Sequence, residues 1–113
     1  MTPDSAGPEP LTPAVFHVLL ALGEGPLHGY AVMQRVEEES GIAMGPGTVY
    51  GSLNRLRDQA WVEEVEDGSG DARRRRAFRL TRAGRAGLER ELGRMTRLAE
   101  LARTRGLRPR EAR

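Results

Sequence analysis

Cysteine and lysine are both absent from this chain, and aromatic residues make up only 4% of it. The absence of cysteine excludes disulfides, thiolate metal sites and a cysteine nucleophile, and it fits a cytoplasmic protein. The few aromatic residues argue against a large aromatic-lined pocket. No apolar run approaches the roughly 18 residues of a membrane span. The acidic, proline-rich start is unlike a signal peptide.

Charge is small in total but unevenly distributed. The formal net charge is +2. Residues 1–40 are acidic in balance, whereas residues 41–113 hold 17 of the 18 arginines and are basic. A basic half whose charges are all guanidinium suits phosphate recognition, because arginine presents a planar fork of donors. Codon composition alone could also produce all-arginine usage.

Two short helices are predicted near the start of the chain. Thr12 and Pro13 suit the N-cap and first turn of one helix, and residues 23–26 end it. A second helix follows residues 27–30 and closes at Gly41, since glycine is common just past a helix end. Two short helices joined by a turn are typical of a helix-turn-helix.

Residues 45–59 predict a third, amphipathic helix, which we expect to carry the function. Its apolar side holds Val49, Leu53, Leu56 and Ala60. Its opposite side is small, hydrogen-bonding and cationic, with Gly47, Gly51, Asn54, Arg55 and Asp58. Such a face can lie in a DNA major groove, where glycine allows close approach and Asn or Arg pairs with base edges. An ordinary surface helix has the same pattern, so the neighbouring segments must decide.

A hairpin with a basic second strand is predicted next. Residues 61–65 favour a short strand, 66–71 a turn and 73–80 a return strand. Phe78 and Leu80 share one face of that strand. The run of arginines at 73–76 is placed to lie along a phosphate backbone or enter a minor groove. The alternative is a basic edge that discourages strand pairing.

The last predicted helix begins after Thr81 and covers residues 82–105. Its apolar positions repeat with 4-3-4-3 spacing, typical of a coiled-coil seam, at Leu88, Leu92, Met95, Ala99 and Ala102, widened by Leu98 and Leu101. A chain of 113 residues has little core left for so long a face. We therefore predict that the helix packs on a second copy. Its glycines, Gly84, Gly87 and Gly93, either mark close helix contacts or lie on the solvent side.

The elements together predict a mainly α fold with a small β-hairpin: a winged helix-turn-helix plus a long C-terminal helix. The winged helix covers residues 11–81 and the dimerisation helix residues 82–105. Residues 1–10 are expected to form a disordered tail and 106–113 a frayed basic tail.

This order of elements resembles the PadR family of bacterial transcriptional regulators over residues 11 to about 103. The resemblance is carried by residues 27–30, 45–50, 53–56, 61–62 and 79–84. Its specific part is Pro-Gly-Thr-x-Tyr followed by Leu-x-Arg-Leu, with the hydrophobic-Thr-x-x-Gly exit. Gly45 stands where such proteins commonly have serine, Gly51 where they often have proline, and Ala77 where they often have an aromatic residue.

The resemblance implies a homodimeric repressor that leaves its operator when a small molecule or another signal acts, although activation stays open. Some members stack flat ligands on an aromatic of the last helix, and this chain has none there. The expected partners are an inverted-repeat double-stranded DNA operator and a second copy, with no cofactor, metal or membrane. The candidate DNA-binding residues are His28, Gly29, Tyr30, Pro46, Gly47, Thr48, Tyr50, Gly51, Asn54, Arg55, Arg73, Arg74, Arg75 and Arg76. The candidate dimer-interface residues are Leu88, Leu92, Met95, Leu98, Ala99 and Ala102.

An interaction module and an enzyme are the two alternative classes of function. A winged helix can serve as a protein–protein interaction module without binding DNA. Such a module should expose aliphatic and aromatic side chains where this third helix carries Asn, Arg and Gly. An enzyme is not expected, because His17 and His28 lie on different segments with no triad, metal spacing or phosphate loop.

Overall fold

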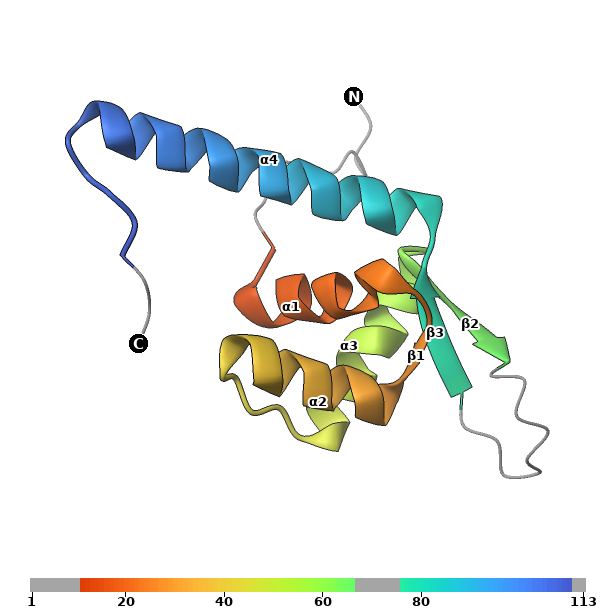
Figure 1. Cartoon of the computed structure of the whole chain (residues 1–113). Coiled ribbons are helices and arrows are strands. Elements are labelled where there is room, and N and C mark those ends of the chain that lie inside the picture. Colours follow the sequence, from red (N-terminus) through yellow and green to blue (C-terminus); the bar gives the residue numbers. More distant parts are fainter. Residues whose placement is uncertain (1–10, 67–75, 111–113) are drawn as a thin grey trace.

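The computed structural model describes residues 11–66 and 76–110 of the chain (Figure 1). The predicted tail at residues 1–10, Arg73, Arg74 and Arg75 of the basic run, and residues 111–113 lie outside this part. The elements in chain order are α1 (Pro13–Ala21), the 3-10 turn η1 (Leu22–Glu24), β1 (Leu27–His28), α2 (Gly29–Ser40), α3 (Pro46–Asp58), β2 (Val62–Glu66), β3 (Arg76–Leu80) and α4 (Arg82–Thr104). Helices α1, α2 and α3 form one group with the sheet at its side, and α4 runs across α1 and extends beyond the group (Figure 1).

The predicted helix starts are confirmed by hydrogen bonds. The Thr12 hydroxyl accepts the Val15 N–H at 3.2 Å, and the Thr81 hydroxyl accepts the Gly84 N–H at 3.0 Å. Gly41 ends α2 in the left-handed conformation at φ 78°. Gly45 occupies the N-cap of α3, where no side chain caps the helix. Local sequence signals therefore set most helix boundaries.

The end of α3 differs from the prediction at Ala60. This residue is exposed and has φ 66°, so its expected place on the buried face was wrong. The Ala60 N–H donates to the Arg57 carbonyl at 2.9 Å, and the Trp61 N–H donates to the Leu56 carbonyl at 2.9 Å. These two bonds form a Schellman motif, which closes the helix after Asp58. The turn sends the chain directly into β2.

The sheet contains one more strand than the predicted hairpin. Its order is β1-β3-β2 and both pairings are antiparallel. Phe78 of β3 lies opposite Leu27 on one side and Glu64 on the other. The sequence predicts only that residues 27–30 lead into α2. A two-residue strand is too short to show an alternating pattern, so its pairing depends on tertiary contacts.

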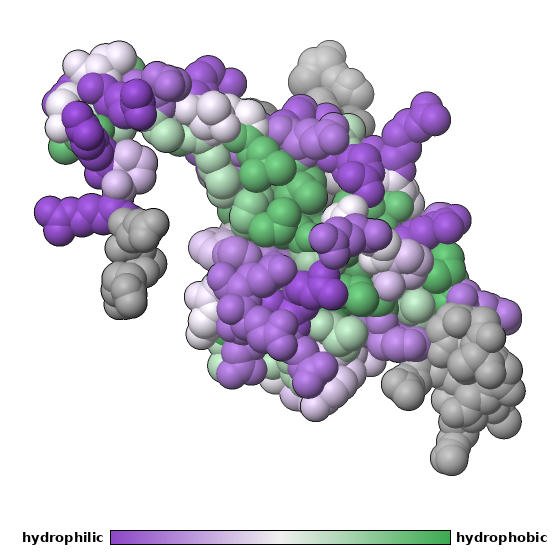
Figure 2. All heavy atoms as spheres, in the orientation of Figure 1, coloured by the Kyte–Doolittle hydropathy of each residue, from purple (hydrophilic) through white to green (hydrophobic). Residues whose placement is uncertain are grey.

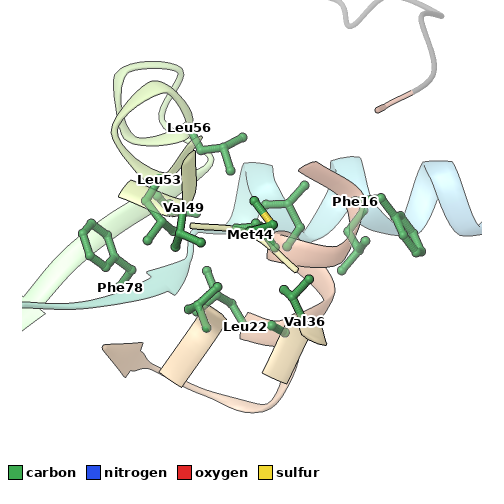
Figure 3. Close-up of a cluster of buried hydrophobic side chains, with 14 residues drawn as sticks. Phe16, Leu22, Val36, Met44, Val49, Leu53, Leu56 and Phe78 are labelled. Carbon is green, nitrogen blue, oxygen red and sulfur yellow. The ribbon is translucent and has the colours of Figure 1, made fainter. Parts of the chain in front are cut away.

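One hydrophobic core joins the helices to the sheet. Helix α3 contributes Val49, Leu53 and Leu56, and Figure 3 shows Val49 and Leu53 near Phe78 of β3 and Leu56 further along the helix. The other buried members are Phe16, Val18, Leu19, Ala21, Leu22, Val32, Val36, Met44, Val62, Ala77 and Leu88. Because the apolar side of α3 is fully used here, its polar side is held outward.

Trp61 joins the winged domain to α4. The Thr81 N–H donates to the Trp61 carbonyl at 3.0 Å, and the Thr81 hydroxyl donates to the Ala60 carbonyl at 2.7 Å. A Cβ added at Gly84 would collide with the Trp61 carbonyl, and one at Gly87 with the Trp61 ring, whereas Gly93 faces open space. Gly84 and Gly87 therefore mark a close contact, and Gly93 lies on the solvent side.

Candidate nucleic-acid interface

The outward face of α3 carries the predicted base-reading residues. Asn54 and Arg55 are exposed, as are Pro46, Gly47 and Thr48, while Gly51 is half-buried. Arg55 forms no ion pair with any residue in the described part of the chain. Its guanidinium is therefore available for a bidentate contact, such as that with a guanine edge.

Tyr50 connects α3 to the start of α2. Its ring lies directly over Gly29, where an added Cβ would collide with the ring and hydroxyl. The ring also meets Phe78 edge-to-face, with centroids 6.4 Å apart and an interplanar angle of 65°. Tyr50 remains 39% exposed and the neighbouring Tyr30 58% exposed, while Gly29 is buried. The structure thus brings the candidate residues at 28–30 and Tyr50 together at one end of α3.

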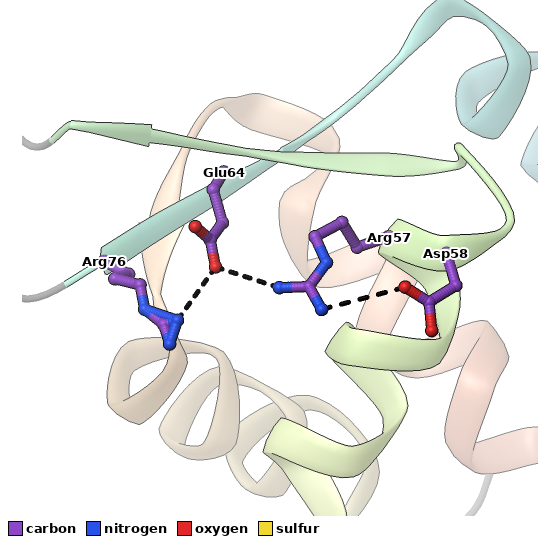
Figure 4. A network of polar contacts seen from close by, with 4 residues as sticks. All are labelled: Arg57, Asp58, Glu64 and Arg76. Carbon is purple, nitrogen blue, oxygen red and sulfur yellow. Dashed lines mark hydrogen bonds and ion pairs between the residues drawn. The ribbon is translucent and has the colours of Figure 1, made fainter.

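Arg76, at the base of the wing, joins a network that sequence reasoning missed. Its Nη1 lies 3.0 Å from Oε2 of Glu64 on β2, and Nη1 of Arg57 lies 3.2 Å from the same oxygen (Figure 4). Asp58 adds a longer contact to Arg57, at 3.7 Å. Arg57 lies in the last turn of α3, a place where the sequence alone favours a basic residue because of the helix dipole. The partnership with Glu64 depends on strand register, which the sequence does not show.

A second ion pair occurs one residue earlier on β2. Nε of Arg79 lies 2.7 Å from Oε2 of Glu63, and these residues are register partners across β2 and β3. Because successive side chains of a strand point to opposite faces, Glu63 and Glu64 serve different sides of the sheet. Glu64 lies on the face of the sheet where its carboxylate contacts Arg57 of α3.

The predicted seam on α4 divides into a buried start and an exposed remainder. Leu88 belongs to the core of its own chain, with 5% of its surface exposed. The larger apolar residues beyond it are between 38% and 48% exposed, and they are Leu92, Met95, Leu98 and Leu101. Ala99 is exposed and Ala102 half-buried. Figure 2 shows apolar side chains gathered where α4 passes over the rest of the chain.

Glu91 is a nearly buried carboxylate beside this seam. It accepts two hydrogen bonds from Arg94, at 3.1 and 2.6 Å. These bonds hold the pKa of Glu91 below its ordinary value, assisted by the charge of Arg94 and a hydrogen bond from the Leu11 backbone, while burial acts in the opposite direction. Glu91 therefore links α4 to Leu11, two residues before the start of α1.

Two other features, a metal site and a membrane-spanning helix, are not indicated in the described part of the chain. Residues 11–66 and 76–110 contain no group of three or more side chains that could hold a metal ion. No helix in the same ranges is both long and apolar enough to cross a membrane.

The fold is a winged helix-turn-helix. It consists of three packed helices, a small sheet whose strands β2 and β3 follow α3, and a long final helix. The sequence profile of the transcriptional regulator PadR-like family matches residues 18–90. The chain belongs to this family of transcriptional regulators.

Comparison with individual proteins agrees on the fold. A PadR family regulator from Clostridium difficile superposes with a TM-score of 0.70 at 20% identity, covering 80% of this chain and 94% of that one. RosR of H. salinarum superposes with a TM-score of 0.68 at 26% identity, covering 79% of this chain and 77% of that one. PadR of Bacillus subtilis, solved in complex with operator DNA, superposes with a TM-score of 0.63 at 23% identity, covering 70% of this chain and 46% of that one.

One curated relative is closer in sequence but much longer. An uncharacterised 37.1 kDa protein in a transposon of Streptomyces fradiae is 48% identical over 82 residues. That match covers 73% of this chain but spans only 23% of the relative's length.

Proposed function

We propose that the chain is a sequence-specific DNA-binding repressor that acts as a homodimer. The observation that carries the proposal is the outward face of α3, where Asn54 and Arg55 are exposed and Arg55 has no ion-pair partner in the described part of the chain. In this arrangement α3 enters the major groove and these two side chains contact base edges. The complex of Bacillus subtilis PadR with operator DNA supports this mode of use for the shared fold.

Phosphates are contacted on both sides of α3 in this proposal. The start of α2, at His28, Gly29 and Tyr30, offers backbone donors and the positive end of a helix dipole. The hydroxyls of Thr48 and Tyr50 add neutral donors at the other helix start. The remaining proposed DNA contacts are Pro46, Gly47 and Gly51 on α3 and Arg73, Arg74, Arg75 and Arg76 on the wing.

Dimerisation is proposed through the exposed part of the α4 seam. Leu92, Met95, Leu98, Ala99 and Ala102 lie along one side of α4, and solvent reaches them in the single chain. Burying a row of large apolar side chains against a second copy is favourable, at about 25 cal/mol per Å² of apolar surface. A two-fold dimer recognises an inverted repeat with half-sites about 10 bp apart or a multiple of this. Release from the operator by a small molecule or another signal is part of the same proposal.

A protein–protein interaction module is the second candidate. It is less well supported, because the exposed side of α3 is polar and cationic. An enzymatic role finds no support in the same surface.

Arg55→Ala and Tyr50→Phe test the proposal on a candidate operator. Tyr50→Phe removes the hydroxyl and keeps the ring that packs on Gly29. It should weaken binding to all sequences alike, whereas Arg55→Ala should relax specificity at one position by about 1–3 kcal/mol. Arg90→Ala on α4 removes the same charge away from α3 and is the matched control.

Fluorescence anisotropy on duplexes with single base changes measures both effects. If Arg55→Ala and Tyr50→Phe bind like Arg90→Ala, the assignment of α3 to the major groove is wrong. Wild-type protein that binds no duplex but captures a protein partner through α3 would favour the interaction module.

A further inference from the structure

The carboxylate of Glu64 lies between two arginines, one on α3 and one on β3. A single oxygen, Oε2, accepts from Nη1 of Arg57 at 3.2 Å and from Nη1 of Arg76 at 3.0 Å (Figure 4). One arginine comes from the last turn of α3 and the other from the base of the wing. Carboxylate and phosphate oxygens are recognised by guanidinium groups in the same way.

Charge within this cluster balances to zero. Arg57 and Arg76 contribute two positive charges, and Glu64 and Asp58 contribute two negative ones. Arg55 differs, because no described residue pairs with it. Among the described residues of the interface, Arg55 is therefore an unpaired cation, whereas Arg57 and Arg76 are both paired with Glu64.

The pairs are exposed enough to be exchanged. The side chains of Arg57, Glu64 and Arg76 are 39%, 32% and 59% exposed. Solvent-exposed ion pairs contribute little to stability, so an incoming phosphate can displace the carboxylate. The cost of that exchange falls on every DNA sequence that the wing approaches.

We propose that Glu64 is an intramolecular competitor of DNA phosphate that lowers the affinity of Arg57 and Arg76 for the backbone. It restrains sequence-independent binding, so that stable complexes depend on the base contacts of α3. Such a repulsive or competing element is a common route to specificity. The inference rests on the proposed DNA binding and adds a residue that opposes it.

Glu64→Gln tests the proposal, with Glu63→Gln as its matched control. Both remove one negative charge from β2, but Glu63 pairs with Arg79 and not with the cluster. Anisotropy is measured for each on a labelled duplex of arbitrary sequence over a series of salt concentrations. Thermal melts confirm folding, and Glu64→Ala serves as a second variant.

Glu64→Gln should bind more tightly than Glu63→Gln and depend more steeply on salt. Every additional phosphate that the protein neutralises adds about 0.9 to the slope of log affinity against log salt. For each additional phosphate, the ratio of the Glu64→Gln affinity to the wild-type affinity should therefore fall about eightfold for each tenfold rise in salt concentration. Arg76→Gln should cost more affinity in the Glu64→Gln background than in the wild type, because in the wild type Arg76 must first give up Glu64 before it contacts phosphate.

The possible outcomes distinguish failure of this inference from failure of the proposed DNA binding. Wild-type protein that binds no duplex overturns the proposed function and the inference together. Wild-type protein that binds, with Glu64→Gln and Glu63→Gln alike in affinity and slope, overturns the inference alone. An Arg76→Gln loss as large in the wild type as in the Glu64→Gln background also overturns it.

Discussion

Substitution of Gly87 by alanine tests the joint between Trp61 and α4. In a helix interior, alanine is more favourable than glycine by about 1 kcal/mol. At Gly87 the new Cβ would collide with the Trp61 ring, which must then move. Overpacking of this kind costs about 1–3 kcal/mol, so the two effects together predict a net loss of about 0–2 kcal/mol.

Two further glycines of α4 calibrate the measurement. Gly93 faces open space, so Gly93→Ala should gain close to the full propensity term of about 1 kcal/mol. A Cβ at Gly84 would meet the Trp61 carbonyl, a backbone atom that cannot rotate away. Gly84→Ala should therefore be the most destabilising of the three. The expected order of stability is Gly93→Ala, wild type, Gly87→Ala, Gly84→Ala.

Urea unfolding measures this order at one fixed protein concentration, because the proposed dimerisation would make stability depend on concentration. Trp61 is the only tryptophan of the chain, so its fluorescence reports directly on the ring that Gly87→Ala displaces. A Gly87→Ala protein as stable as Gly93→Ala, with unchanged tryptophan emission, would refute the packing of Trp61 on this helix.

Three further predictions concern the seam, the buried carboxylate and the end of α3. Leu98→Glu should convert the proposed dimer to a monomer in light scattering, whereas Arg97→Glu, on the side of α4 opposite Leu92, Met95 and Ala99, should not. A persistent Leu98→Glu dimer would place the interface elsewhere. Since the folded-state pKa of Glu91 lies below its ordinary value of 4.5, its contribution to stability is complete above 4.5 and is lost as pH falls through the lowered pKa. The stability difference between wild type and Glu91→Gln in urea unfolding should therefore shrink as pH falls below 4.5, and a constant difference would contradict the Arg94 pairing. Ala60→Gly should stabilise by roughly 1 kcal/mol, because Ala60 holds φ 66° in a Schellman turn, and a loss of stability would contradict that turn.

The resemblance to PadR proteins was correct because its motif residues are local and chemically distinctive. The segments at 27–30 and 79–84 each combine a helix start with a glycine, Gly29 or Gly84, that admits a close contact. The residue types of such motifs can be recognised without knowing which distant residue makes the contact. Candidate residues at 28–30 and Tyr50 proved to be neighbours. The structure added the reason, which is that Gly29 leaves room for the Tyr50 ring.

Local chemistry was sufficient to predict the helices, their caps and the two sides of α3. Thr12 and Thr81 bond to amides three residues ahead, and Val49, Leu53 and Leu56 repeat with the helical period, so short-range information specifies both features. Other features arise between segments far apart in the chain. They include the pairing of β1 with β3, the burial of Leu88 and the shared contact of Arg57 and Arg76 with Glu64. Strand register and the packing of α4 set these contacts, because only the folded chain brings such residues within a few ångströms of each other.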